Sequence, residues 1–254
     1  MSSPILSIRH LRREFKMGGE TVHALRSVSF DVCAGEFLTI MGTSGSGKST
    51  MLNILGCMDK PTSGEYILDG EHIEKMKTES LANIRCRKLG FVFQSYNLLS
   101  RTSAIENVEL PLLYNSKIAA EERRERAFNA LKRVGLESRM NHLSNQLSGG
   151  QQQRVAIARA LVNDPVIILA DEATGNLDTR TSYEIMEIFQ ELHSRGKTIV
   201  FVTHEPDIAT FSTRTIVLRD GQIRRDSPNE NVQSAKAAFE ALPPAETFEE
   251  TESL

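Results

Sequence analysis

Short apolar runs alternate with amphipathic segments along most of this 254-residue chain. The runs have the length of buried strands, at residues 37–41, 89–93, 166–170 and 198–203. Between them, a periodicity close to 3.6 residues predicts helices at residues 49–55, 151–162 and 179–194. Because strands that alternate with helices form a largely parallel sheet, the pattern predicts an α/β fold.

Alternation in steps of two marks a different kind of strand near the two ends of the chain. Val28, Phe30 and Val32, for example, are separated by polar residues. Strands of an N-terminal antiparallel β subdomain are therefore predicted at residues 5–15, 22–32 and 66–68. Near the C-terminus, residues 215–219 and 222–225 predict a hairpin across Asp220-Gly221.

The middle of the chain, about residues 95–146, predicts an inserted α-helical subdomain. Ser103 and Glu106 have the spacing of a capping box at a helix start, and Pro111 should divide that helix. A second helix is predicted at 119–134, with a charged solvated face, and Gly135 should end it.

With 254 residues, the chain can hold one large α/β domain, or a core domain that carries an inserted subdomain. We expect that domain at residues 1–226. Residues 227–254 carry several prolines and glutamates, so we expect an acidic, disordered tail with a short helix around residues 235–242.

Charge and hydropathy exclude some classes of partner. The net charge of −3 gives no reason to expect nucleic acid. The apolar runs are far shorter than the roughly 20 residues that span a bilayer, and Arg9, Arg12 and Arg13 come too early for a signal peptide. The three widely spaced cysteines predict reduced thiols without a metal, so we expect a cytoplasmic protein.

A glycine-rich segment after the 37–41 strand predicts a phosphate-binding loop of the pattern G-x-x-x-x-G-K-[ST]. Backbone N–H groups of such a loop surround nucleotide phosphates, the lysine reaches the β- and γ-phosphates, and the hydroxyl after it binds Mg²⁺. The alternative is a simple Gly/Ser-rich turn. The predicted nucleotide-binding residues are Gly42, Thr43, Ser44, Gly45, Ser46, Gly47, Lys48, Ser49 and Thr50.

Two carboxylates, Asp171 and Glu172, follow the 166–170 strand. Ligands bind at the carboxyl ends of parallel strands, so Asp171 is predicted to hold Mg²⁺ and Glu172 to act as the general base toward water. Taken alone, such a pair also suits a helix N-cap. Next to a phosphate-binding loop, the catalytic interpretation is favoured.

A second anion-binding helix start is predicted at Ser148, Gly149, Gly150 and Gln151, where Ser148 caps the helix and the glycines leave its first amides open. One active site does not need two such devices. A second subunit is therefore expected to complete each site.

These three motifs together resemble the nucleotide-binding subunit of ABC transporters over roughly residues 5–226. Gln94 matches the family's Q-loop, residues 176–178 its D-loop and His204 its switch histidine. Phe15 matches the aromatic that stacks on adenine, although His23 and its neighbours could also line the base pocket.

The resemblance implies a head-to-tail homodimer that encloses two ATP molecules. Each ATP would lie between the phosphate-binding loop and carboxylates of one subunit and residues 148–151 of the other. His204 would contact the γ-phosphate, Gln94 would sense Mg²⁺, and Asp178 would lie at the nucleotide. Ala173 departs from the family's usual proline after the general base, which should loosen that turn; hydrolysis is still expected.

Residues 53–64 and 170–178 are most similar to the lipoprotein-releasing and macrolide-efflux group (LolD- and MacB-like). That resemblance implies an ATPase on the cytoplasmic face of the inner membrane, driving a permease, with a periplasmic adaptor as a further partner. A cell-division regulator acting through a similar permease is the alternative. DNA-repair and translation ABC proteins are disfavoured because no coiled-coil insertion, zinc module or second ATPase domain is found. The missing membrane span argues against a fused permease, and the cargo is not specified by these residues.

Overall fold

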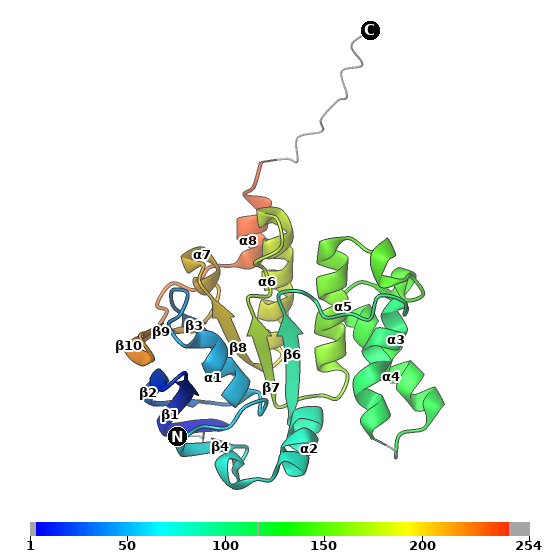
Figure 1. Cartoon of the computed structure of the whole chain (residues 1–254). Helices are drawn as coiled ribbons and strands as arrows, with labels where there is room; N and C mark the ends of the chain where they lie inside the picture. The colour runs from blue at the N-terminus through cyan, green and yellow to red at the C-terminus, as the bar shows by residue number, and fades with distance from the viewer. Residues whose placement is uncertain (1–3, 116, 244–254) are drawn as a thin grey trace.

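Two β-sheets and a group of helices make up the computed structural model, which describes residues 4–115 and 117–243. Figure 1 shows the strands of the central sheet between helices on one side and the small N-terminal sheet on the other. The predicted α/β fold with an antiparallel β subdomain and a helical subdomain is confirmed.

The central sheet has six strands in the order β10-β9-β3-β8-β7-β6. All neighbours pair in parallel except β10 with β9, which form the predicted hairpin. The strands are β3 (Phe37–Met41), β6 (Leu89–Phe93), β7 (Ile167–Asp171), β8 (Thr198–Thr203), β9 (Arg214–Arg219) and β10 (Gln222–Pro228).

Both faces of this sheet are buried, which explains the continuous apolar runs. On β7, Ile168 and Ala170 belong to the cluster under the helices, whereas Ile167 and Leu169 belong to the cluster under the N-terminal sheet. Residues of β8 alternate in the same way. The sheet is therefore packed between two hydrophobic cores, one on each of its faces.

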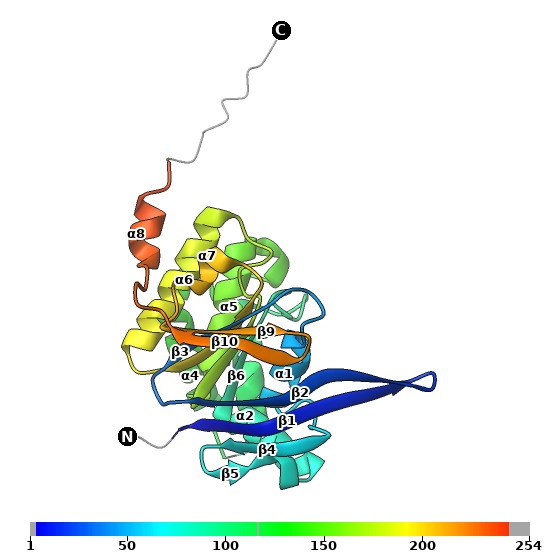
Figure 2. The ribbon, with the colours of Figure 1, turned by 90° about the vertical axis from the view of Figure 1, so that its left-hand side faces the viewer.

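The N-terminal sheet has the order β2-β1-β4-β5 and is antiparallel. Its strands are β1 (Leu6–Met17), β2 (Glu20–Val32), β4 (Ser63–Leu68) and β5 (Glu71–His72). Figure 2 shows the β1–β2 hairpin projecting beyond the neighbouring elements. Its inner residues share a core with α1 (Lys48–Leu55).

The helical subdomain contains α3 (Ala104–Glu109), a 3₁₀ helix (Leu110–Tyr114) and α4 (Ala120–Arg133), which pack against α5 (Gly149–Leu161). Ser103 and Glu106 form the predicted capping box. The α-helix ends before Pro111, as predicted, because proline cannot donate the next helical hydrogen bond.

Two α-helices of the described residues were not predicted from the sequence pattern, α2 (Thr78–Lys88) and the short α7 (Pro206–Ala209). Helix α2 buries only Leu81 and Ile84, so its apolar periodicity is too weak to be recognised. Helix α6 (Thr179–Ser194) has the bounds predicted from the sequence.

The predicted disordered tail from residue 227 needs correction up to residue 243, whereas the short helix predicted around residues 235–242 is confirmed. Strand β10 continues to Pro228, and helix α8 (Ala235–Glu240) packs against α6 (Figure 1). The Gln190 side chain on α6 accepts a hydrogen bond from the Ala235 N–H at 2.8 Å and donates to the Gln233 carbonyl at 2.7 Å. Composition suggested disorder for this segment because tertiary contacts, which hold it in place, are not visible in composition. Residues 244–254 of the predicted tail lie outside the described residues.

Among the described residues, no helix is both long and apolar enough to cross a membrane.

We predict that Gln190→Met lowers the free energy of unfolding by about 1–3 kcal/mol, because two carbonyls and one N–H lose their partner. Denaturant unfolding measures this change. Gln233→Met, at an exposed side chain, is the control. Equal stability of both variants would contradict the role of Gln190 in docking α8.

Candidate active site

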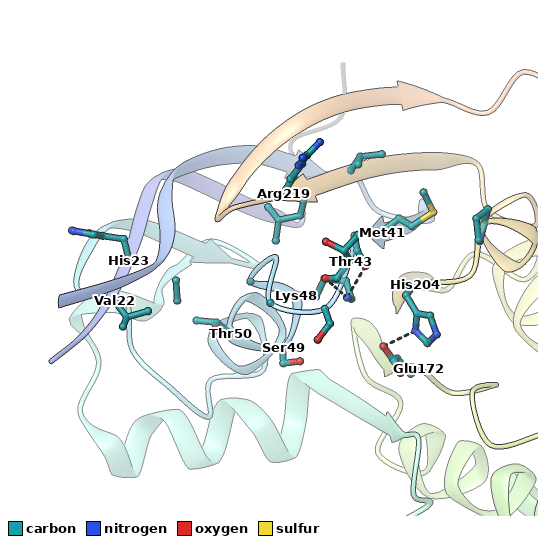
Figure 3. Close-up of a pocket in the computed structure, with 18 residues that line it drawn as sticks. Val22, His23, Met41, Thr43, Lys48, Ser49, Thr50, Glu172, His204 and Arg219 are labelled. Carbon is teal, nitrogen blue, oxygen red and sulfur yellow. Dashed lines mark hydrogen bonds and ion pairs between the residues drawn. The ribbon is translucent and has the colours of Figure 1, made fainter. Parts of the chain in front are cut away.

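A cavity of about 1180 Å³ lies at the carboxyl ends of β3, β7 and β8 (Figure 3). The register pairs Met41 with Thr203, so the loop that starts at Gly42 lies next to His204. Glu172 follows β7 at the same edge. Three chain segments that are far apart in sequence therefore meet in one cavity.

The loop between β3 and α1 has no space for side chains at two of its glycines. A Cβ at Gly42 would collide with the Leu218 carbonyl and the Ser46 hydroxyl. Gly47 has φ +104°, and a Cβ there would lie 2.6 Å from the Ala24 carbonyl oxygen. Gly47 is also the N-cap of α1 and offers no side-chain cap, so the first amides of α1 remain open for an anion.

Lys48 is buried although it carries a charge. Its ammonium donates to the carbonyls of Gly42 at 2.7 Å and Thr43 at 3.0 Å, as the dashed lines in Figure 3 show. Nearby, the buried Ser46 hydroxyl has no hydrogen-bond partner within the described protein. A buried cation, an unpartnered hydroxyl and open helix amides fit phosphate oxygens.

Asp171 ends β7 and is half-buried. Burial and the neighbouring Glu172 carboxylate raise the pKa of Asp171, and the Lys48 ammonium opposes this rise. A cation beside the two carboxylates would relieve their repulsion, so the donors fit Mg²⁺, which prefers oxygen ligands.

Glu172 and His204 are hydrogen-bonded to each other: His204 Nδ1 lies 3.0 Å from Glu172 Oε1 (Figure 3). The Glu172 backbone has φ +44°, which is uncommon for a residue with a side chain. Its N–H donates to the Val202 carbonyl at 2.8 Å, and its carbonyl accepts from the Gly175 N–H at 2.9 Å. Such local strain is typical of functional sites.

Gln94, at the end of β6, contacts the segment that follows Glu172. Its amide donates to Asn176 Oδ1 at 3.4 Å, and Asn176 donates back to the Gln94 carbonyl at 3.1 Å. The two loops that sequence predicted to lie at the nucleotide are thus joined to each other.

The predicted second anion site lies apart from the cavity lining, at the start of α5. Ser148 caps this helix and forms a capping box with Gln151, while Gly149 and Gly150 form its first turn. Asp178 caps α6 by accepting from the Thr181 N–H at 2.9 Å, and hydrogen bonds from Thr181 lower the pKa of Asp178. Neither group lines the cavity in the single chain.

Phe15 also differs from its predicted position in the cavity wall. The wall is formed by Val22, His23 and Ala24 on β2, whereas Phe15 is the cross-strand partner of Val22 and lies under the Arg13 guanidinium. Base stacking by Phe15 stays a prediction. Figure 3 shows Val22 and His23 on the side of the loop opposite Glu172.

The sequence pattern missed Arg219, which lines the cavity from β9. The sequence predicted only that Arg219 belongs to a hairpin strand. Nothing in its sequence neighbourhood indicates that it contacts a ligand.

Comparison with known proteins agrees with this geometry. The family model described as ABC transporter matches residues 25–175. The chain is 53% identical over 222 residues to the ABC transporter ATP-binding protein YvrO of Bacillus subtilis, covering 87% of this chain and 96% of that protein. It is 46% identical over 237 residues to the macrolide export ATP-binding/permease protein MacB of Hyphomonas neptunium, covering 93% of this chain but 37% of that protein.

The fold is similar to a solved structure, the dimeric post-hydrolysis state of the ATP-binding cassette MJ0796 bound to ADP and Pi. The TM-score is 0.81 with 48% sequence identity, covering 89% of this chain and 99% of that one. The extent of these matches, together with the cavity at the ends of β3, β7 and β8, shows that the chain belongs to the ATP-binding subunits of the ABC transporter family, which are ATPases.

Proposed function

We propose that this chain binds ATP with Mg²⁺ and hydrolyses it as a homodimer that drives a MacB- or LolD-like membrane permease. The observation that carries the proposal is the cavity in which the buried Lys48 and the Glu172–His204 pair lie at one sheet edge. The dimeric cassette relative and the MacB relative support the homodimer and the permease.

Phosphate binding would use the loop and the helix start. Backbone amides from Gly42 to Thr50 would surround the phosphates, and Lys48 would exchange its two loop carbonyls for β- and γ-phosphate oxygens. Ser46 would gain a partner for its buried hydroxyl. The β2 residues Val22 and His23 would contact the base.

Asp171, Ser49 and Gln94 would hold Mg²⁺. When bound, Mg²⁺ neutralises charge that develops on the phosphates. Its binding requires the ionised Asp171 carboxylate, which the nearby Lys48 favours.

Glu172 is our proposed general base. It would accept a proton from the attacking water, and His204 would hold the carboxylate through the 3.0 Å contact and reach the γ-phosphate. The second subunit would contribute residues 148–151, in which the Gly149 and Gly150 amides take no part in the capping box and lie outside the cavity of the single chain. Asp178 would then act at the dimer interface.

The permease would dock on the helical subdomain. Among the described residues, seven large apolar side chains are exposed, and four of these belong to this region: Leu99, Leu113, Tyr114 and Leu143. Binding there would place the chain on the cytoplasmic face of the inner membrane. A periplasmic adaptor would join on the far side, and a cell-division regulator working through a similar permease remains the second candidate.

We predict that Lys48→Ala weakens ATP binding by about 10- to 100-fold, the loss of one charge-assisted hydrogen bond worth roughly 1.5–3 kcal/mol. Turnover should fall with it. Nucleotide titration measures the affinity, with Lys88→Ala, a surface ion-pair lysine, as the control. Normal binding by Lys48→Ala would overturn the phosphate-loop assignment.

Glu172→Gln should retain ATP binding but lower turnover by about 10²- to 10⁴-fold, the usual contribution of a general base. With ATP and Mg²⁺, light scattering should detect a trapped dimer. Glu191→Gln, which breaks a surface pair with Arg195, is the control. Normal hydrolysis by Glu172→Gln would show that another group is the base.

Tyr114→Asp should abolish co-purification of a permease with tagged Glu172→Gln protein from detergent-solubilised membranes, because it places a charge in the proposed apolar contact. ATP hydrolysis by the isolated Tyr114→Asp subunit should be unchanged. Val232→Asp, at an exposed apolar side chain elsewhere, is the matched control. Permease recovery unaffected by Tyr114→Asp would place the docking surface elsewhere.

A further inference from the structure

Helix α5 sends polar side chains to two segments of the active site, besides carrying Ser148 to Gln151 at its start. Gln153 reaches the turn after β7. Near the other end, Arg159 donates to the carbonyls of Tyr96 at 2.8 Å and Asn97 at 2.5 Å, which belong to the loop after Gln94. One helix therefore carries one functional segment at its start and contacts two others.

The contact of Gln153 is the most specific of these. Its side chain is fully buried, and its Nε2 donates to the Ala173 carbonyl at 2.7 Å. Ala173 directly follows Glu172 and is itself buried. The two residues are 20 positions apart in the chain, so the bond joins two separate elements.

A glutamine at position 153 is unfavourable for the stability of the folded state. Its Oε1 is buried and has no partner within the described protein. The opposite amide orientation would bring Oε1 against the Ala173 carbonyl, so donation by Nε2 is the chemically consistent arrangement. A buried amide with an unpartnered oxygen loses hydration that an apolar side chain would not lose.

The Ala173 carbonyl belongs to a turn whose backbone is otherwise held from two directions. The Val202 carbonyl of β8 accepts from the Glu172 N–H, and the Glu172 carbonyl accepts from the Gly175 N–H within the turn. Gln153 adds a restraint from α5 at the residue that directly follows Glu172, whose backbone has φ +44°. Ala173 lacks the proline ring that would restrict this turn by itself. The hydrogen bond from the Gln153 side chain restricts the turn instead.

We propose that Gln153 is a positioning residue for Glu172: it holds the Ala173 carbonyl and thereby the direction in which the carboxylate points. The proposal rests on the proposed role of Glu172 as general base. Gln153 is on the helix that begins at Ser148, and this helix start is expected to face the nucleotide bound by the partner subunit. Gln153 therefore also connects that helix with Glu172, the base that acts on the nucleotide bound by its own chain.

The test compares Gln153→Met with Gln190→Met. Both replace a glutamine that donates to backbone carbonyls by an apolar side chain of similar length. Gln190, however, donates to Phe211 and Gln233, which do not line the cavity. We expect Gln153→Met to lower kcat by about 10- to 100-fold, since small misplacements of a catalytic group have effects of this size. ATP affinity should change by less than about threefold for both variants, and kcat should be unchanged in Gln190→Met.

A double-mutant cycle separates positioning from general loosening. Single-turnover hydrolysis is measured for Gln153→Met, Glu172→Gln and the combined variant. If Gln153 acts through Glu172, then Gln153→Met causes no further loss in the Glu172→Gln background.

Equal fold-losses in both backgrounds would overturn the proposal, as would a loss of kcat in Gln190→Met that matches Gln153→Met. Denaturant unfolding of each variant verifies that the folded state is populated during the assay. If Glu172→Gln itself hydrolyses ATP normally, the proposed base is overturned. If Glu172→Gln loses turnover and Gln153→Met does not, the positioning role alone is overturned.

Discussion

Parallel pairing of β3 with β8 and of β8 with β7 sets the relative positions of the phosphate-binding loop, the two carboxylates and His204. Met41 lies opposite Thr203, and Asp171 lies opposite Val202. The next residues along these strands are Gly42, His204 and Glu172. A shift of one residue in either pairing would turn the strand faces over and move both carboxylates, so the two buried cores that hold the register also hold the chemistry.

Several unfavourable local features lie at this edge of the sheet. Lys48 is buried, Glu172 has a left-handed backbone, and Ser46 and Gln153 each bury a polar atom without a protein partner. Each feature costs on the order of 1–3 kcal/mol. They persist because the surrounding sheet and helices are closely packed. Bound phosphates would give partners to Lys48 and to the Ser46 hydroxyl, but not to the Gln153 oxygen.

Much of the fold followed from periodicity. Strands β3, β6, β7 and β8 could be predicted from short apolar runs, since strands buried on both faces show no alternation with polar residues. Helix α2 escaped because only Leu81 and Ile84 are buried along it. A short helix was predicted around residues 235–242 and is present as α8, but composition suggested disorder around it. The contacts of this segment with Gln190 and Arg180 are encoded by no local pattern.

The chain's sequence by itself determined the chemical groups: a loop that binds phosphates, two carboxylates after a strand, and a capped helix start rich in glycine. These follow from residue types at short spacings, where local backbone geometry is sufficient. Only the tertiary structure decided that Val22 and His23 rather than Phe15 form the cavity wall, and that Gln153 holds the carbonyl after Glu172. Those contacts join residues on different elements, and their geometry depends on how sheets and helices pack, which sequence spacing does not specify.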